Sequence, residues 1–274
     1  SLVLNAAGVS TNDEVIIQAY TCEAVPEAIF SVGATPIYAD ISLKTMSLSI
    51  ESVKRKISKK TKALIYQHTF GIISQEIQTI VELCRSYDIL LIEDCCHCVF
   101  DHTTPPDLGL YGDAAFFSFE WGKPIVGGLG GSLIVHREDL LAKVQSHFSH
   151  FSKPNSNCRA LLEYAVYKFT NFSFLKSRIK ILYRFATKIN FIRGNFNTNH
   201  NRFHEYCLEI TPVTKLLVIL QIKQKRPQYS VIPPEINDFR FTSYLRDQNH
   251  LFRFPLFFKD KEQAFKLAAK HRLD

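Results

Sequence analysis

The stretch Leu90-Leu-Ile-Glu-Asp94 has the pattern of a short apolar strand that ends in two acids, and Cys95-Cys-His97 follows it at once. A continuous apolar run of this length is typical of a strand buried on both faces of a parallel sheet. Sites in open α/β sheets form beyond the carboxyl ends of the strands. Asp94 and His97 are therefore predicted to face such a site.

Short apolar runs alternate with helical patterns on both sides of this stretch. The predicted strands are Glu14–Gln18, Thr35–Ala39, Ala63–Gln67, Leu90–Ile92, Ala114–Ser118 and Gly131–His136. The predicted helices are Ala24–Ser31, Ile50–Lys56, Gln75–Ser86 and Glu138–His147. This alternation predicts one doubly wound α/β domain with a mostly parallel sheet over residues 1–150.

The second part of the chain differs in composition and charge. Residues 151–225 are predicted to form a helical, aromatic and basic region, and residues 226–274 the start of a small α/β domain. Residues 1–150 hold 11 Lys and Arg against 17 Asp and Glu, a net charge of −6, whereas residues 151–274 hold 22 against 9, a net charge of +13. A basic half can meet nucleic acid, anionic lipid or an anionic small substrate, and charge alone does not choose among them.

Composition excludes several classes of protein. With 274 residues and 46% hydrophobic residues, the chain buries enough apolar surface to fold, which excludes disorder. Its longest apolar runs, such as Leu216 to Leu220, fall far short of the ~20 residues that span a bilayer. Seven cysteines, an odd number, favour reduced thiols and a cytoplasmic location. The start at Ser1, with an apolar helical pattern directly after it, predicts that a longer protein has been cut at this end.

A second stretch, Phe116-Phe-Ser-Phe-Glu-Trp-Gly-Lys123, follows another predicted strand and leads into Gly127-Gly-Leu-Gly-Gly131. A lysine beside glycines and apolar groups is suited to Schiff-base chemistry, because desolvation lowers its pKa and frees the amine. An aspartate at a neighbouring strand end, Asp94, is suited to the protonated ring nitrogen of pyridoxal phosphate. The hydroxyl of Ser118 can donate a hydrogen bond to a phosphate.

An ordered series of short motifs resembles the DegT/DnrJ/StrS sugar aminotransferases, which are fold-type-I pyridoxal-phosphate enzymes. The series is Asp13-Glu-Val-Ile16, Tyr20-Thr-Cys22, Gly33-Ala-Thr-Pro36, Asp40-Ile41, Thr61-Lys-Ala63, His68-Thr-Phe-Gly71, Ile92-Glu-Asp94, Gly112-Asp-Ala114, Phe117-Ser-Phe119, Lys123 and Gly130-Gly131. The resemblance covers Leu2 to about Lys143 and is faint beyond it. It implies a fold-type-I large domain that binds pyridoxal phosphate.

The resemblance also implies a role for each matching residue. Lys123 is expected to form the Schiff base with the cofactor and to move the proton between the donor and the cofactor. Asp94 is expected to pair with the pyridinium nitrogen, His97 to line the ring, and Ser118 to hold the phosphate. Cys22 stands where many members place an aromatic that stacks on the ring. A plain serine at 118 and a core histidine at 97 remain the alternatives.

Three departures from the family pattern stand out. The Gly-Thr phosphate loop of the family is expected before Ser1. The Asn and Arg that the family presents to the partner's site are expected before the helix Val213–Lys223, but Glu209-Ile-Thr-Pro212 stands there. The small C-terminal domain is expected to be cut after its first strand, Phe252–Phe258, and the helix that follows.

Tyr20 and His68 are expected to lie behind the residues that touch the cofactor.

Other chemistries are less well supported by the sequence. The run Cys95-Cys-His-Cys98 lacks the two-to-four-residue gaps of a zinc site, so no metal site is predicted. Gly127–Gly131 is interpreted as room for the backbone beside the lysine. The segment Leu161–Arg193 interleaves aromatic and basic residues and is expected to pack on the α/β domain, with contact to an anionic membrane surface as the alternative. No nucleic-acid motif is present.

The leading hypothesis is therefore a pyridoxal-phosphate aminotransferase. It is expected to move an amino group from glutamate to a nucleotide-linked keto-sugar, in the biosynthesis of cell-surface polysaccharide or glycan precursors, and to act as a cytoplasmic homodimer. The alternative is a non-catalytic relative that serves as a binding, regulatory or membrane-surface module. A sugar dehydratase on the same scaffold is disfavoured by Lys123, because such relatives usually carry histidine there.

Overall fold

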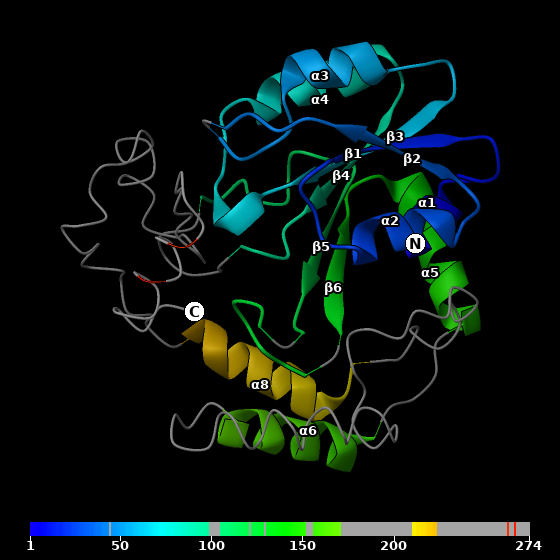
Figure 1. Ribbon diagram of the computed structural model, residues 1–274. Helices are drawn as coiled ribbons and strands as arrows, with labels where there is room; N and C mark the ends of the chain where they lie inside the picture. The colour runs from blue at the N-terminus through cyan, green and yellow to red at the C-terminus, as the bar shows by residue number, and fades with distance from the viewer. Residues whose placement is uncertain are drawn as a thin grey trace.

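A computed structural model describes residues 1–43, 45–98, 105–120, 122–128, 130–151, 156–170 and 210–223, together with Glu262 and Lys266. Its centre is a six-stranded sheet with the strand order β2-β1-β3-β4-β5-β6. The first five strands pair in parallel and β6 pairs antiparallel to β5. Helices cover both faces of this sheet (Figure 1). The predicted α/β class with a mostly parallel sheet is confirmed.

The elements follow one another as the sequence pattern predicts. The strands are β1 Glu14–Gln18, β2 Thr35–Ala39, β3 Thr61–Gln67, β4 Leu90–Asp94, β5 Ala114–Ser118 and β6 Gly131–Val135. The helices are α1 Leu2–Ala6, α2 Ala24–Phe30, α3 Ile50–Lys56, α4 Ile77–Ser86, α5 Glu138–Phe151, α6 Asn157–Thr170 and α8 Pro212–Lys223, and a short 3₁₀ turn spans Thr69–Gly71. Every strand and helix predicted within residues 1–150 is present, with small shifts at the ends.

Helix α3 shows how local sequence sets an element's limits. The Ser49 side chain caps its first turn by accepting a hydrogen bond from the Ser52 N–H at 3.3 Å. Its last turn is basic, and cations near a helix C-terminus are stabilised by the helix dipole. The helix can therefore form where the apolar pattern places it, against the sheet.

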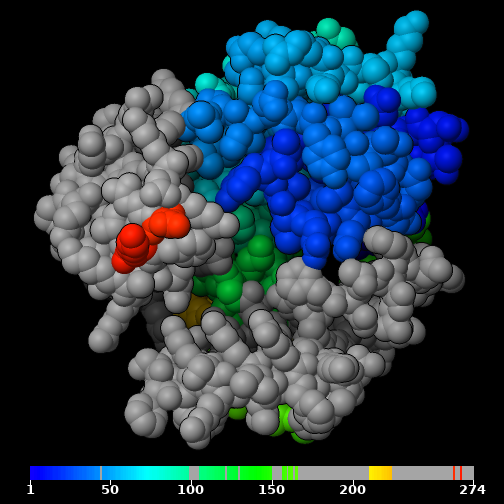
Figure 2. Space-filling view, in the orientation of Figure 1, coloured from blue at the N-terminus to red at the C-terminus, as the bar shows by residue number. Residues whose placement is uncertain are grey.

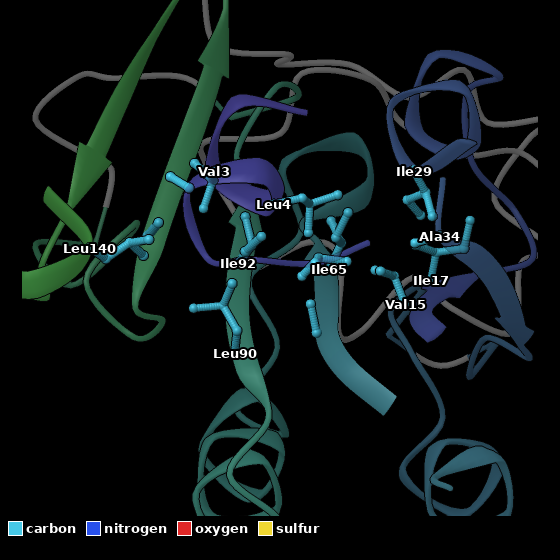
Figure 3. Packing of buried hydrophobic residues seen from close by; sticks show 14 of the residues in the cluster. Val3, Leu4, Val15, Ile17, Ile29, Ala34, Ile65, Leu90, Ile92 and Leu140 are labelled. Carbon is cyan, nitrogen blue, oxygen red and sulfur yellow. The ribbon is translucent and has the colours of Figure 1, made fainter. Parts of the chain in front are cut away.

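Each face of the sheet has its own hydrophobic core. On one face, α1, α2 and α5 pack against strand residues such as Val15, Ile17 and Ile92, as Figure 3 shows from close by. On the other face, α3 and α4 pack against Ile16 and Leu91. Since successive side chains of a strand point to opposite faces, Glu93 belongs to the α3 and α4 side of β4 and Asp94 to the α1 and α5 side.

Helices α6 and α8 contact each other and lie beyond the end of β6 (Figure 1). Both fall in the region 151–225 that the sequence predicts to be helical. Most of the basic segment 161–193, and the predicted strand Phe252–Phe258, lie outside the described residues, and of the predicted helix after that strand only Glu262 and Lys266 are described, both helical. No helix within the described ranges is both long and apolar enough to span a membrane.

Candidate functional site

A cavity of about 920 Å³ opens at the carboxyl ends of β3, β4 and β5. Its wall is formed by α1, the start of α2, one side of α5 and the residues around the start of α8. Figure 2 shows green atoms, from the part of the chain that includes β6, recessed behind the blue atoms of the N-terminal segments. The wall includes all five residues that the sequence singles out: Cys22, Asp94, His97, Ser118 and Lys123. Residues 101 positions apart in the sequence therefore meet at one site.

Asp94 is the last residue of β4 and is only 5% exposed. Burial raises the pKa of its carboxyl, while the hydrogen bond from the Cys96 N–H to Oδ1 (2.9 Å) and the charges of Lys123 and His68 act in the opposite direction. Among the described residues, no lysine, arginine or histidine lies within ion-pair distance of Asp94. This buried carboxylate can therefore accept a cationic N–H from a molecule in the cavity.

Ser118 and Lys123 lie at the end of β5 and in the loop that follows. Ser118 faces Gly131 of β6, where a Cβ atom would come within 2.1 Å of the Phe117 carbonyl oxygen, so this close approach of the two strands requires glycine. Lys123 is half-buried, and its backbone N–H donates to the Glu120 backbone carbonyl at 3.2 Å. Burial raises the pKa of the Glu120 carboxyl and the charge of Lys123 lowers it, with a net rise. The loop thus places an amine and a carboxyl together in the cavity wall.

His97 is held from behind by Phe70. The Phe70 N–H donates to His97 Nδ1 at 3.2 Å, and the two rings are stacked with centroids 6.1 Å apart and planes at 6°. Phe70 has φ 58°, a left-handed conformation that is costly for a non-glycine residue and persists only where the surroundings enforce it. The ring of Tyr20 in turn lies beside the ring of Phe70, with the two ring centroids 6.1 Å apart. Tyr20 and Phe70 thus support His97 without lining the cavity.

Cys22 is exposed at the cavity mouth, just before α2. The preceding loop is fixed to β3 because the Thr21 hydroxyl donates to Gln67 Oε1 at 2.6 Å. Gln67 also lines the cavity and donates to the Thr69 hydroxyl at 3.2 Å. The position of Cys22 therefore depends on hydrogen bonds at the end of β3.

A comparison with known protein families identifies the family of this chain. The model of the DegT/DnrJ/EryC1/StrS aminotransferase family matches residues 1–172, more than half of the chain. The chain belongs to this family. The resemblance seen in the sequence motifs is confirmed.

Individual members of the DegT/DnrJ/EryC1/StrS family agree with this assignment. GDP-perosamine synthase of Vibrio cholerae is 35% identical over 142 residues, 52% of this chain and 38% of that protein. The spore coat polysaccharide biosynthesis protein SpsC of Bacillus subtilis is 31% identical over 144 residues, 53% of this chain and 37% of that protein. The crystal structure of NtdA from Bacillus subtilis with the bound cofactor PMP has a TM-score of 0.50 and 30% identity, covering 55% of this chain and 33% of that one. The chain thus spans less than half the length of the relatives it matches, and the fold-type-I class is confirmed.

The cavity meets the chemical demands of the family's pyridoxal cofactor. Its volume of about 920 Å³ lies in the range of small-molecule sites. Asp94 supplies a buried anionic acceptor for a ring N–H, and Lys123 supplies an amine on the same wall. The hydroxyl of Ser118 is available at the wall for an anionic group. The residues present therefore fit such a group.

Directly behind Asp94, on the opposite face of the sheet, lies a buried cluster that consists of His68, Glu93 and Cys95. The Glu93 carboxylate accepts hydrogen bonds from three backbone N–H groups, those of Gly109 (3.2 Å), Tyr111 (2.7 Å) and Gly112 (2.8 Å), and contacts His68 Nε2 at 3.0 Å. Burial raises the pKa of the Cys95 thiol well above its usual value. A neutral thiol and a carboxylate already engaged by four donors are poor metal ligands. The cluster therefore stabilises the chain beneath the site.

Several wall residues were not predicted from the sequence. Gln67 and Cys96 flank Asp94, Glu120 flanks Lys123, and Ile210 and Lys215 come from the start of α8. Gln67 ends a predicted strand, and Cys96 follows one directly, so their position at a carboxyl end was a usable signal. No sequence signal places α8 at the cavity, because its contact with the β5–β6 loop depends on how the chain packs.

Proposed function

We propose that this chain carries the cofactor site of a pyridoxal-phosphate-dependent aminotransferase that acts on a nucleotide-linked keto-sugar. The single observation that carries the proposal is the meeting of Asp94 and Lys123 on one cavity wall, where the charge of Lys123 partly opposes the rise in the pKa of Asp94 that burial causes. The membership of the DegT/DnrJ/EryC1/StrS family supports it.

When bound, pyridoxal phosphate supplies an aldehyde carbon and an electron-withdrawing aromatic ring. Asp94 would hold the proton on the ring nitrogen, because a buried carboxylate without a protein counter-ion within ion-pair distance stabilises that cation. Lys123 would hold the aldehyde end of the cofactor through its amine, and the free amine would accept and return a proton at Nζ. Ser118 would donate to the phosphate, and His97 and Cys22 would lie beside the ring.

The proposed substrates follow from relatives and from charge. The relative from Vibrio cholerae is named for a GDP-linked product, and that from Bacillus subtilis for polysaccharide biosynthesis. Lys215 brings a second lysine to the cavity wall, which favours an anionic substrate such as a nucleotide sugar. We further propose glutamate as amino donor, a homodimer in the cytoplasm, and the division of the chain into a large domain (1–150), a helical region (151–225) and the start of a small domain (226–274).

Borohydride trapping tests the proposal directly. The chain is mixed with pyridoxal phosphate and reduced, and peptide mass spectrometry locates the label; we expect most of it on Lys123. Lys123→Ala should remove the label and the near-visible absorbance band while the far-ultraviolet circular dichroism is unchanged, since a half-buried loop lysine contributes little to the core. Lys62→Ala, at an exposed lysine of β3, is the matched control and should retain both signals. A label distributed equally over surface lysines would refute the proposal and favour a non-catalytic relative.

A further inference from the structure

The loop that carries Lys123 is held by a helix far along the chain. Gln221 of α8 donates from Nε2 to the Val126 carbonyl at 2.6 Å, and its Oε1 accepts from the Val126 N–H at 3.0 Å. These partners are 95 residues apart in the sequence. One side-chain amide thus satisfies both backbone groups of a single loop residue, as a neighbouring strand would.

The amide of Gln221 is fixed in one orientation. Its Nε2 also donates to the Leu217 carbonyl of the preceding helical turn at 3.0 Å. Rotating the amide by half a turn would bring Oε1 against two carbonyl oxygens, so only the observed orientation satisfies all three contacts. A carboxylate of the same shape would have the same conflict. The contact therefore requires an amide at position 221.

The loop has few other ways to satisfy Val126. The loop closes on itself through hydrogen bonds from the Phe119 N–H to the Gly130 carbonyl (2.9 Å) and from the Gly127 N–H to the Phe119 carbonyl (2.7 Å). These bonds hold the two ends of the loop together, but they do not involve the segment from Lys123 to Val126. Val126 is only 6% exposed, and buried backbone groups need partners. Gln221 is the partner that the described part of the chain provides.

Helix α8 also fits closely against the same loop. A Cβ atom at Gly127 would come within 2.9 Å of Thr214 Cγ2 and 3.1 Å of Val218 Cγ2, so the backbone of the loop lies directly on the helix. The helix start is fixed by Thr211, whose hydroxyl accepts from the Thr214 N–H at 3.1 Å. The loop is thus held by hydrogen bonds at Val126 and by contact at Gly127.

We propose that Gln221 is a positioning residue, which holds the Lys123 loop in place through its two hydrogen bonds to Val126. The proposal rests on the proposed function in so far as it gives Lys123 a chemical role. Gln221 does not line the cavity, and it lies beyond residue 172, where the match to the family model ends. It acts by keeping the amine at a constant place relative to Asp94, on which attack geometry depends.

The first measurement needs no cofactor, and it begins with the unaltered chain. Hydrogen exchange of the full chain, resolved to the Val126 amide, should show protection because that N–H donates to Gln221. Gln221→Met keeps the length of the side chain and removes the amide, so it should speed this exchange about tenfold or more. It should also change the rate at which acetic anhydride acylates Lys123, measured relative to Lys62 in the same sample. Gln78→Met, at an exposed glutamine of α4, is the matched control and should change neither quantity.

The second measurement adds pyridoxal phosphate. Gln221→Met should slow labelling of Lys123 under borohydride by roughly tenfold to a hundredfold, the range for a misplaced reacting group. Gln221→Asn, which keeps the amide on a shorter arm, should recover part of the rate. An unprotected Val126 amide in the unaltered chain would overturn the proposal, even if the variants failed to fold. So would a folded Gln221→Met chain with unchanged exchange and unchanged Lys123 acylation. Absence of any cofactor adduct in the unaltered chain would refute the proposed function alone, because exchange and acylation do not depend on it.

Discussion

Replacing Glu93 by glutamine should destabilise the protein strongly at low pH and much less at high pH. Glu93 is fully buried and its carboxylate contacts His68 Nε2 at 3.0 Å. Removing one partner of a buried ion pair costs about 3–5 kcal/mol, because the other charge loses its partner. That is a large part of the roughly 5–15 kcal/mol by which a typical domain is stable.

The pH dependence follows from His68. Burial alone lowers the pKa of His68, but the neighbouring Cys95 sulfur and the Glu93 carboxylate outweigh it and raise the pKa from 6.5 to about 9. Because the folded protein holds this proton more tightly than the unfolded chain, the stabilisation is fully present below about pH 6.5 and is lost as the pH rises through about 9. Each pH unit in that window is worth about 1.4 kcal/mol, which gives roughly 3 kcal/mol in total.

Urea unfolding followed by circular dichroism at about pH 5.5 and about pH 9.5 measures this effect. The destabilisation caused by Glu93→Gln should be smaller at the higher pH, because the imidazole of the unaltered protein is then neutral. The difference should be at most roughly 3 kcal/mol, since Cys95 also contributes to the raised pKa of His68. Glu82→Gln, at an exposed position of α4, is the matched control and should have a small effect at both pH values. The same loss of stability at both pH values for Glu93→Gln would refute the reasoning, since it would mean that His68 is not charged in the folded protein.

Two further changes probe Asp94 in the cavity wall and the contact between the Lys123 loop and α8. Asp94→Asn should weaken binding of pyridoxal phosphate and shift the absorbance of the bound cofactor, because the amide cannot stabilise a ring cation; unaltered spectra and affinity would contradict this role. Gly127→Ala should destabilise the protein by about 1–3 kcal/mol through overpacking, since the new Cβ would approach Thr214 Cγ2 to 2.9 Å. Thermal unfolding measures this cost, and the double variant Gly127→Ala with Thr214→Ser should recover part of it.

The sheet could be predicted because local patterns and long-range packing agree there. Continuous apolar runs such as 90–92 fit only a strand covered on both faces, and the structure places helices on both sides of β4. The antiparallel direction of β6 was not predicted. Its burial pattern alternates, as is typical of an edge strand, but the sequence Gly131–Val135 does not reveal in which direction it runs.

The candidate site was partly predictable for the same reason. The five predicted residues lie at the carboxyl end of a strand or in the loop after it, and parallel strands bring these ends together: Cys22, Asp94, His97, Ser118 and Lys123. What the sequence could not show is the contribution of α8. A helix that is apolar nearly all round has no single face that predicts its partner, so the contact between Gln221 and Val126 emerges only from the packing.

The two adjacent acids of β4, Glu93 and Asp94, lie in different environments on opposite faces of the sheet. Because neighbouring side chains point to opposite faces, Glu93 enters the α3 and α4 side, where three N–H groups and His68 satisfy it. Asp94 enters the cavity, where Cys96 supplies hydrogen bonds to its carboxylate and the described chain offers no cation within ion-pair distance. Glu93 is engaged by four donors within the protein, whereas the Asp94 carboxylate has room for a further donor from the cavity. A shift of one residue in the register of β4 would exchange these environments, so the parallel pairing of β4 with β3 and β5 determines which acid faces the cavity.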